Sequence, residues 1–313
     1  MDPLTVDDDR AGERLDRYLA DAVPGLSRSQ AQRLIDDGHV RVEGRQAKAN
    51  LALKAGDVIH VTLPEPTPTT AVAEDIPLPV LYEDSDIVVV DKPAGMVVHP
   101  AAGHSSGTLV NALLHHVDDL SGIGGELRPG IVHRLDKGTS GVMVVAKHDA
   151  AHEALAAQFE ARTVEKEYVA LVWGVVQAGR RIDLPIGRDP KDRQKMSARS
   201  RRARSAVTRI TKAEHLRGVT LCAVAIHTGR THQIRVHLSA IGHPVVGDAT
   251  YGGVKARVAQ DLRPVLRLDR PFLHAARLAF DHPGDGRPLS FEAPLPADLQ
   301  GLLDDLHQLQ GDE

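Results

Sequence analysis

The chain has 313 residues, 42% of them hydrophobic and 26% charged, which supports a buried core in one large domain or in a large and a small one. Its formal net charge of −4 argues against a nucleic-acid partner unless the basic residues are segregated on the surface. Aromatic residues make up 3% of the chain, which argues against broad stacking platforms for bases, and the single cysteine excludes an internal disulfide.

The first sixty residues predict a small module of two helices and two strands. Apolar residues at helical spacing over 15–22 predict a short helix. Ser27 begins a Ser-x-x-Gln capping box for a second helix, which ends at Gly38. Residues 40–44 alternate and then turn, and 54–61 read as a turn and a second strand.

A stretch rich in Pro and Thr at 64–70 predicts a semi-rigid linker, because alternating prolines cannot continue a helix or strand. Beyond it, short β-branched runs at 87–90 and 142–146 predict buried strands. Residues 96–98 are expected to continue as a strand, and 108–116 to form a helix.

The later elements complete a mixed architecture. They are a helix from Asp149, strands at 166–174, around 206–210 and at 219–226, a helix ended by Gly242, a strand at 273–280 and an amphipathic helix over 299–306. Because strands and helices do not alternate regularly, the sequence predicts an α+β fold with a mixed, mostly antiparallel sheet rather than a doubly wound one.

The nine residues 133–141, His-Arg-Leu-Asp-Lys-Gly-Thr-Ser-Gly, stand directly before the buried strand at 142–146. Turn-forming residues dominate them, so a solvated turn is one interpretation. A polar segment at the mouth of a buried strand is also typical of an active-site loop on a rigid sheet. The whole string resembles the catalytic signature of the large-subunit ribosomal RNA pseudouridine synthases, which implies that Asp136 is the catalytic residue.

Other strings extend this resemblance across the chain, namely 166–168, 229–235 and 242–248. The N-terminal module resembles the S4 RNA-binding domain. Together they are similar to the D-type pseudouridine synthases of the large ribosomal subunit and their near relatives. The resemblance implies an S4-type RNA-binding domain of small α/β form at 1–63, a linker at 64–75 and a pseudouridine synthase domain at 76–313.

The resemblance also implies roles in the reaction, which detaches uracil, turns it and rejoins it through a carbon. A buried carboxylate tends to become neutral, so a cation must sit beside Asp136, and Arg235 matches the family's arginine. Tyr168 matches the tyrosine that stacks on the flipped base, and its phenol could also act as a base. The remaining pocket residues are expected to be His133, Arg134, Leu135 and, as an apolar wall, Leu273.

Two regions are candidates for RNA contact. In the module, the resemblance to the S4 domain implies Arg28, Gln32 and Arg33 on the second helix, which could equally be solvated helix residues. The segment 188–212 carries ten basic and two acidic residues, and this excess suits RNA phosphates, although a mobile solvated loop is the bland alternative. The arginines expected to bind there are Arg199, Arg201, Arg202 and Arg204.

RNA is therefore the expected partner of a monomeric, cytoplasmic enzyme without membrane spans, metal or cofactor. Two other functions stay open. Gly103-His-Ser-Ser-Gly107 fits the G-x-S-x-G pattern of a serine hydrolase with Ser105 as nucleophile. The chain could also be a non-catalytic RNA-binding protein. Metal binding by His115, His116, His232 and His237 is disfavoured, because no His-Glu-x-x-His motif or paired cysteines accompany them.

Overall fold

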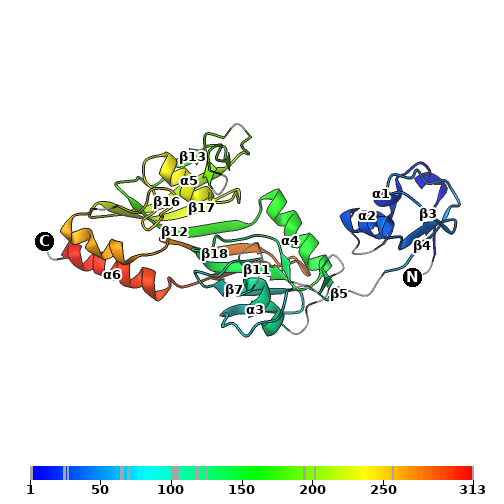
Figure 1. The fold of residues 1–313 in the computed structure, drawn as a ribbon, viewed down its shortest axis with the longest axis horizontal. Coiled ribbons are helices and arrows are strands. Elements are labelled where there is room, and N and C mark those ends of the chain that lie inside the picture. Colours follow the sequence, from blue (N-terminus) through cyan, green and yellow to red (C-terminus); the bar gives the residue numbers. More distant parts are fainter. Residues whose placement is uncertain are drawn as a thin grey trace. The chain divides into compact units, whose positions relative to one another are not determined.

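The computed structural model describes residues 3–23, 26, 28–63, 67–68, 71–99, 106–117, 120, 122–123, 126–127, 129–192, 195–200, 202–255 and 257–311. The chain forms two compact units (Figure 1). The first comprises Met1–Thr70, Leu120–Arg128 and His148–Ala150, and the second Ala71–Asp119, Pro129–Lys147 and Ala151–Glu313. The domain boundaries predicted at 63 and 75 stay predictions.

The first unit packs two helices against a small sheet. Its helices are α1 (Leu15–Ala22) and α2 (Arg28–Asp36), and its sheet has the order β1 (Leu4–Thr5), β4 (Val58–Val61), β2 (Val40–Val42) and β3 (Arg45–Gln46). A 3₁₀ turn, η1, spans Asp8–Arg10. Leu15, Leu19, Ile35 and Ile59 are fully buried in its core. The predicted helices and strands are confirmed, because their apolar periodicity faces this single core.

Within the predicted linker, β5 (Thr67–Pro68) pairs in parallel with β9 (Glu126–Leu127), which pairs with β8 (Gly122–Ile123). A proline can take an edge position in a sheet, where its missing N–H is not needed. Two residues of the predicted linker therefore pair as a short strand. Its other residues at 64–66 and 69–70 lie outside the described ranges.

The second unit is built on a sheet of ten strands. Along the sheet the order is β13 (Arg181–Asp183), β16 (Val207–Leu216), β17 (Val219–Ile226), β12 (Glu165–Trp173), β18 (Leu273–Asp281), β11 (Ser140–Ala146), β7 (Ile87–Lys92) and β6 (Val80–Glu83). Two further strands, β10 (Gly130–Ile131) and β19 (Pro288–Glu292), pair with β11 and β18. Among the described pairings of this sheet, β11 with β18 is parallel and the others are antiparallel. The predicted α+β class is confirmed.

Helices cover this sheet. α4 (Asp149–Ala161) packs Ala151 and Leu155 onto Val142 and Val144 of β11, and in Figure 1 α3 (Leu109–His116) lies on the other side of these strands. The remaining helices are α5 (Gln233–Ala240), η2 (Gln260–Arg267) and α6 (Ala297–Gly311). Among the described helices, none combines the length and apolar character needed to cross a membrane.

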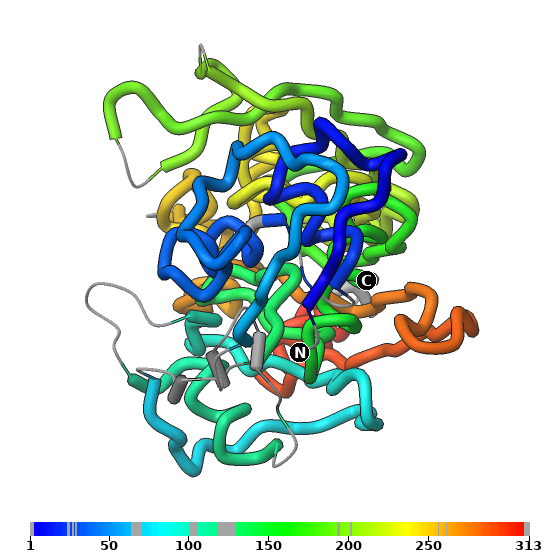
Figure 2. The backbone as a smooth tube through the Cα atoms, turned by 90° about the vertical axis from the view of Figure 1, so that its right-hand side faces the viewer, coloured from blue at the N-terminus to red at the C-terminus, as the bar shows by residue number. Residues whose placement is uncertain are grey.

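One strand prediction is wrong. Residues 96–98 do not continue as a strand, and Val97 makes only an isolated bridge to Thr108. The turn before it ends at Gly95, whose φ of 87° redirects the chain away from β7. Several short strands escaped prediction, among them β10, β13 and β19 of the large sheet. The hairpin of β14 (Gly187–Arg188) and β15 (Met196–Ser197) did so because such short polar strands lack a readable apolar period. In Figure 2 the segment around them, in light green, projects from the second unit.

The sheet order brings distant segments together. β18 lies between β12 and β11, so the start of β18, the middle of β12 and the residues before β11 become neighbours. The register pairs Ser140 with His274 and Tyr168 with Ala275. α5 follows β17, the strand on the other side of β12. The polar loop before β11 and the start of α5 therefore approach the same part of the sheet.

The parallel pairing of β11 with β18 requires a glycine at position 141. Its φ is +119°, and a Cβ there would overlap the backbone of Ala275, with Ala275 N only 2.7 Å away. Gly141→Ala is expected to lower the free energy of unfolding by about 3 kcal/mol or more, through backbone strain and loss of the β11–β18 contact. Urea unfolding measures this loss.

Gly179→Ala is the matched control, because Gly179 also has a positive φ, of 83°, but open space around it. It should cost only about 1–2 kcal/mol. Equal losses for the two variants would contradict the close approach of β11 and β18.

Candidate active site

The loop that carries Asp136 is held from three directions. Within it, Thr139 N–H donates to Asp136 O at 3.0 Å, and Gly95 N–H donates to Lys137 O at 2.7 Å. Arg270 Nη1 donates to Gly138 O at 3.2 Å. Asp298, in the first turn of α6, fixes Arg270 through two hydrogen bonds of 2.6 and 2.8 Å. The rigid backbone leaves the Asp136 carboxylate with a defined direction.

Arg235, on α5, joins two carboxylates. Its Nη1 donates to Asp136 Oδ2 at 3.0 Å. Its Nε and Nη2 form a two-pronged pair with Asp248 at 2.6 and 2.9 Å. The Asp248 side chain is fully buried, whereas that of Asp136 is 18% exposed. Asp248 therefore aims the guanidinium, and Asp136 is the carboxylate that solvent or a ligand can reach.

Arg235 stays protonated and positively charged in this environment. Burial on its own would lower its pKa, but the hydrogen bonds and charge of Asp248, and then those of Asp136, raise it. A buried carboxylate without a cation would tend to take up a proton. The pair thus keeps a cation beside Asp136, as the sequence resemblance implied.

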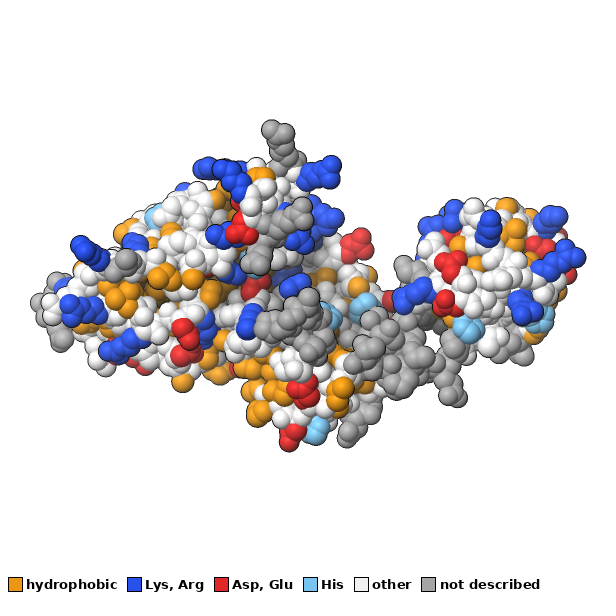
Figure 3. Space-filling model, viewed as in Figure 1, with side chains coloured by type: hydrophobic (Ala, Val, Ile, Leu, Met, Phe, Trp, Pro, Cys, Tyr) orange, Lys and Arg blue, Asp and Glu red, His pale blue; other side chains and the backbone are white. Residues whose placement is uncertain are grey.

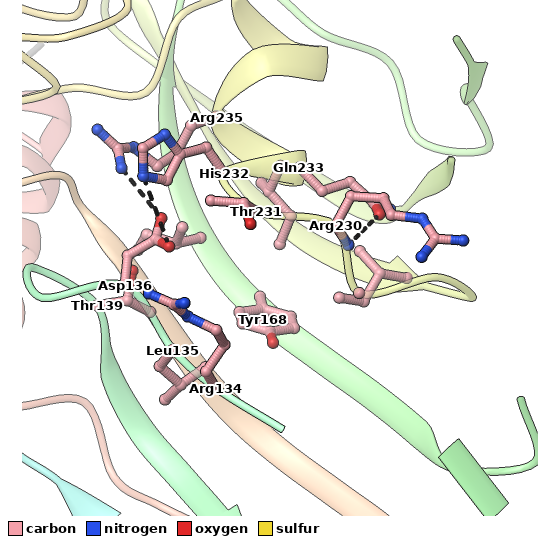
Figure 4. A pocket seen from close by; sticks show the side chains of 14 residues that line it. Arg134, Leu135, Asp136, Thr139, Tyr168, Arg230, Thr231, His232, Gln233 and Arg235 are labelled. Carbon is pink, nitrogen blue, oxygen red and sulfur yellow. Dashed lines mark hydrogen bonds and ion pairs between the residues drawn. The ribbon is translucent and has the colours of Figure 1, made fainter. Parts of the chain in front are cut away.

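Tyr168 lies on β12 at a bulge, where the register against β18 shifts between Glu167 and Tyr168. Such a bulge re-aims a side chain. The Tyr168 side chain faces the cavity beside Asp136 (Figure 4). Burial, and to a lesser degree the charge of Asp136, raise the pKa of Tyr168 well above its ordinary value, so the phenol stays protonated at neutral pH.

These residues enclose a cavity of about 80 Å³. Its lining includes Arg134, Leu135, Asp136, Tyr168, Arg235 and Leu273, all from the predicted site. A groove of about 570 Å³ adjoins it and shares Arg134 and Tyr168, with the cations of Arg162, Lys166 and Arg230 along its side. A small pocket that opens into a basic groove suits one base of a longer anionic strand.

His133 lines the adjoining groove rather than the Asp136 cavity. Its Nε2 accepts the Val144 N–H at 3.1 Å, and its ring stacks on Phe159 with centroids 4.7 Å apart. Burial, with the nearby charge of Lys166, lowers the pKa of His133 to about 3. Its contacts hold the start of the loop against β11 and α4.

Three residues near Asp136 were given no part in the reaction from the sequence: His232, Asp248 and Lys92. His232 Nε2 lies 3.8 Å from Asp136 Oδ1. Lys92 is fully buried, its Nζ donates to the carbonyls of Pro93 and Met96 at 2.8 and 2.9 Å, and burial lowers its pKa to about 8 against the opposing charge of Asp136. In the sequence, their place inside the matching strings 229–235 and 242–248 was the signal that could have pointed to His232 and Asp248.

In the first unit, the predicted RNA-binding residues are partly engaged with the protein. Arg28 Nε and Gln32 Nε2 both donate to Asp16 Oδ2, at 3.2 and 2.6 Å, and Asp16 is buried. Arg28 keeps 54% of its side chain exposed, and Arg33 is exposed. Asp16 thereby orients the face of α2 that was expected to meet RNA.

In the second unit, Arg199, Arg202 and Arg204 are exposed, and Arg201 lies outside the described residues. Figure 3 shows Lys and Arg side chains gathered above this part of the molecule, over β13 and α5. Lys and Arg side chains also lie elsewhere on the visible surface, and RNA contact by these arginines stays a prediction.

The alternative sites find no support. Ser105 lies outside the described residues. His115 contacts Asp75 at 3.4 Å, and His116 bonds to Ile76 O at 2.6 Å. Within the described part of the chain, the group with metal-ligand spacing is Asp84, Asp86 and His282.

Hydrogen bonds within the protein explain why Asp84 and His282 of this group lie close together. His282 Nδ1 accepts from the backbone of Gly284 and Asp285, so its Nε2–H donates to Asp84 at 2.8 Å. A ring with both nitrogens engaged in this way holds a turn and has no lone pair left for a metal.

Comparison with known proteins identifies the family. The RNA pseudouridylate synthase family matches residues 86–240, and the S4 domain matches residues 13–59. The chain is 46% identical over 306 residues to the uncharacterized RNA pseudouridine synthase YlyB of Bacillus subtilis, covering 97% of this chain and 98% of the relative. It is 44% identical over 304 residues to the ribosomal large subunit pseudouridine synthase D of Zymomonas mobilis, covering 96% of each.

A solved structure agrees. The human RNA pseudouridylate synthase domain containing 4 superposes with a TM-score of 0.58 at 27% identity, covering 73% of this chain and 93% of that one. The chain belongs to the RNA pseudouridine synthase family and carries an S4 domain. The predicted enzyme class and its RNA substrate are confirmed, and the hydrolase and the non-catalytic binder are not supported.

The neutral state of His133 predicts a pH dependence of stability. Below about pH 6.5 the unfolded chain binds a proton at His133 that the folded chain, with its pKa of about 3, does not. Stability should therefore fall by about 1.4 kcal/mol per pH unit from this group as pH drops from about 6.5 toward 3.

His133→Gln should remove that component, because a Gln amide oxygen can accept the Val144 N–H without titrating. Urea unfolding at pH 7, 6 and 5 compares the variant with wild type, and His227→Gln, at an exposed histidine, serves as control. Parallel pH profiles for wild type and His133→Gln would show that His133 is not held neutral.

Proposed function

We propose that this enzyme converts specific uridines of large-subunit ribosomal RNA to pseudouridine, with Asp136 as the reacting residue. The name of the Zymomonas mobilis relative supports the ribosomal substrate. The observation that carries the catalytic assignment is the 3.0 Å contact between Arg235 and Asp136 at the wall of a cavity of about 80 Å³. The monomeric state and the cytoplasmic location remain predictions.

The reaction is an isomerisation that balances without a further reactant. The nitrogen–carbon glycosidic bond of the uridine breaks, and a carbon–carbon bond to the same sugar forms. One proton leaves the ring carbon and one joins the ring nitrogen. Because nothing is oxidised or reduced, side chains that stabilise charge and move a proton suffice in principle.

Asp136 would act on the charge that develops when the glycosidic bond breaks. The sugar gains positive character, and a carboxylate can stabilise or trap it, or add to the uracil ring instead. Both routes need the ionised form. Arg235 holds Oδ2 of Asp136, which leaves Oδ1 for the uridine.

Tyr168, Leu135 and Leu273 would receive the base. The Tyr168 ring offers a face for stacking, and the two leucines offer apolar walls. The raised pKa of Tyr168 favours the stacking role over that of a general base, since a base would need the phenolate. Its hydroxyl can still donate a hydrogen bond.

Basic surfaces would offset the cost of extruding the uridine, which is about a few kcal/mol. Arg134 stands where the cavity meets the basic groove, and it can contact the strand on either side of the extruded nucleotide. Phosphate contacts from Arg199, Arg202 and Arg204, and from Arg28, Gln32 and Arg33 of the S4 domain, would add affinity without reading bases.

Asp136→Asn tests the catalytic assignment. The amide keeps the shape of the carboxylate but lacks its charge, so single-turnover pseudouridine formation on ribosomal RNA of the large subunit should fall at least about 10³-fold while RNA binding stays within about threefold. Mass spectrometry of the digested RNA measures the product, and filter binding measures affinity.

Asp183→Asn changes an exposed carboxylate that pairs with Arg181, and it should leave the rate unaltered. Wild-type rates in the Asp136→Asn enzyme would refute the assignment. Loss of product in a Ser105→Ala enzyme with an intact Asp136 would point to the serine instead.

A further inference from the structure

His232 stands at the start of α5 with a left-handed backbone, φ 56°. Its side chain lines the Asp136 cavity and points toward Asp136 (Figure 4). Nδ1 lies 2.7 Å from Tyr251 Oη, and Nε2 lies 3.8 Å from Asp136 Oδ1. Non-glycine residues rarely hold this backbone conformation without a reason, and here it turns the ring toward Asp136.

Tyr251 determines which nitrogen of His232 carries the proton. Its Oη already accepts the Met196 N–H at 2.8 Å. Among the described protein groups, His232 Nδ1 is the acceptor within reach of the hydroxyl proton, which favours Tyr251 as the donor of this hydrogen bond. A neutral His232 must then carry its own proton on Nε2, the nitrogen that faces Asp136.

The surroundings keep His232 neutral. Burial lowers its pKa; Asp136 opposes that shift, Arg235 favours it, Asp248 opposes it and Arg134 favours it. Among the described residues, Lys137, Asp192, Lys195 and Arg230 also line the pockets that His232 lines. A neutral imidazole is a hydrogen-bond donor that does not cancel the negative charge of the carboxylate beside it.

The two oxygens of Asp136 therefore face two different donors. Oδ2 accepts from Arg235 Nη1 at 3.0 Å, and Oδ1 faces His232 Nε2–H at 3.8 Å. This second distance is too long for a hydrogen bond, but catalytic hydrogen bonds are often long without substrate and shorten in the reacting complex. Each carboxylate oxygen has two lone pairs, so Oδ1 keeps one for the uridine.

Tyr251 supports both donors at once. Its ring lies 5.0 Å from the Arg235 guanidinium carbon, and its backbone N–H donates to Asp248 Oδ1 at 3.1 Å. Tyr251 thus contacts Arg235, which binds Oδ2 of Asp136, and also His232, which faces Oδ1.

We propose that His232 is a positioning residue for Asp136, whose Nε2–H, fixed by Tyr251, donates to Oδ1 when the uridine enters and locks the plane of the carboxylate. This inference rests on the proposed reacting role of Asp136. It predicts that what matters at position 232 is a neutral donor at the place of Nε2.

Two amides distinguish a donor at Nε2 from a merely structural side chain. The Gln amide nitrogen reaches the place of His Nε2, whereas the Asn amide nitrogen reaches only that of Nδ1. In single-turnover assays, His232→Asn should react about 30-fold more slowly at saturating enzyme, with an unchanged half-saturating concentration, because the carboxylate is misplaced while RNA binding is retained. His232→Gln should recover the rate to within about fivefold of wild type.

The left-handed backbone at position 232 separates an effect on folding from the proposed effect on the rate. Asn adopts the left-handed conformation more readily than Gln, so folding alone would favour His232→Asn. An Asn variant as fast as the Gln variant, or a loss seen only as a raised half-saturating concentration, would overturn the proposal.

Nitrogen-15 NMR of the imidazole rings tests the proton position without any reaction. The resonance absent from His232→Gln should report a neutral ring protonated at Nε2 at pH 7, and Tyr251→Phe should shift it toward the other tautomer. A ring protonated at Nδ1, or at both nitrogens, would refute the proposal even if the enzyme is active. Absence of pseudouridine formation by the wild type would instead refute the proposed function while leaving the tautomer measurable.

Discussion

One arginine between two carboxylates is the interaction on which the site depends. Asp248 is buried and binds two nitrogens of Arg235, so its negative charge sets the direction of the guanidinium. The third nitrogen is left for Asp136. A buried charge is tolerated only when it is paired, and this arrangement satisfies Arg235 while leaving Asp136 at the wall of a cavity. The guanidinium of Arg235 is therefore already fixed beside Asp136 before RNA binds.

The sheet supplies the rigidity that this arrangement needs. β18 lies between β12 and β11, which sets Leu273, Tyr168 and the Asp136 loop around one cavity although they are far apart in the chain. The fully buried β11 cannot shift without disturbing its neighbours, so its loop inherits that stability. The C-terminal helix α6 reaches the same loop through Asp298 and Arg270.

Local periodicity was enough to predict most of the large elements, such as α1, β7, β11 and β12, because their apolar spacing reflects a single buried face. The β14–β15 hairpin and the failed strand at 96–98 depend on turns and long-range pairing, which a local pattern does not report. The family resemblance supplied Asp136, Tyr168 and Arg235. It did not supply Asp248 or His232, whose parts in the site arise from contacts that exist only after folding, as when Arg235 meets Asp136 across 99 positions.

The central claim is that an extruded uridine enters the cavity beside a charged, pre-oriented Asp136. A crystal structure of the inactive Asp136→Asn enzyme with an RNA that the wild type modifies tests it most directly. The account predicts that the target base lies out of its stack against Tyr168, with the side chain at position 136 still held by Arg235 and pointing at the nucleotide. A uridine that remains stacked in the RNA, or a base bound in a cavity that residue 136 does not line, would contradict it.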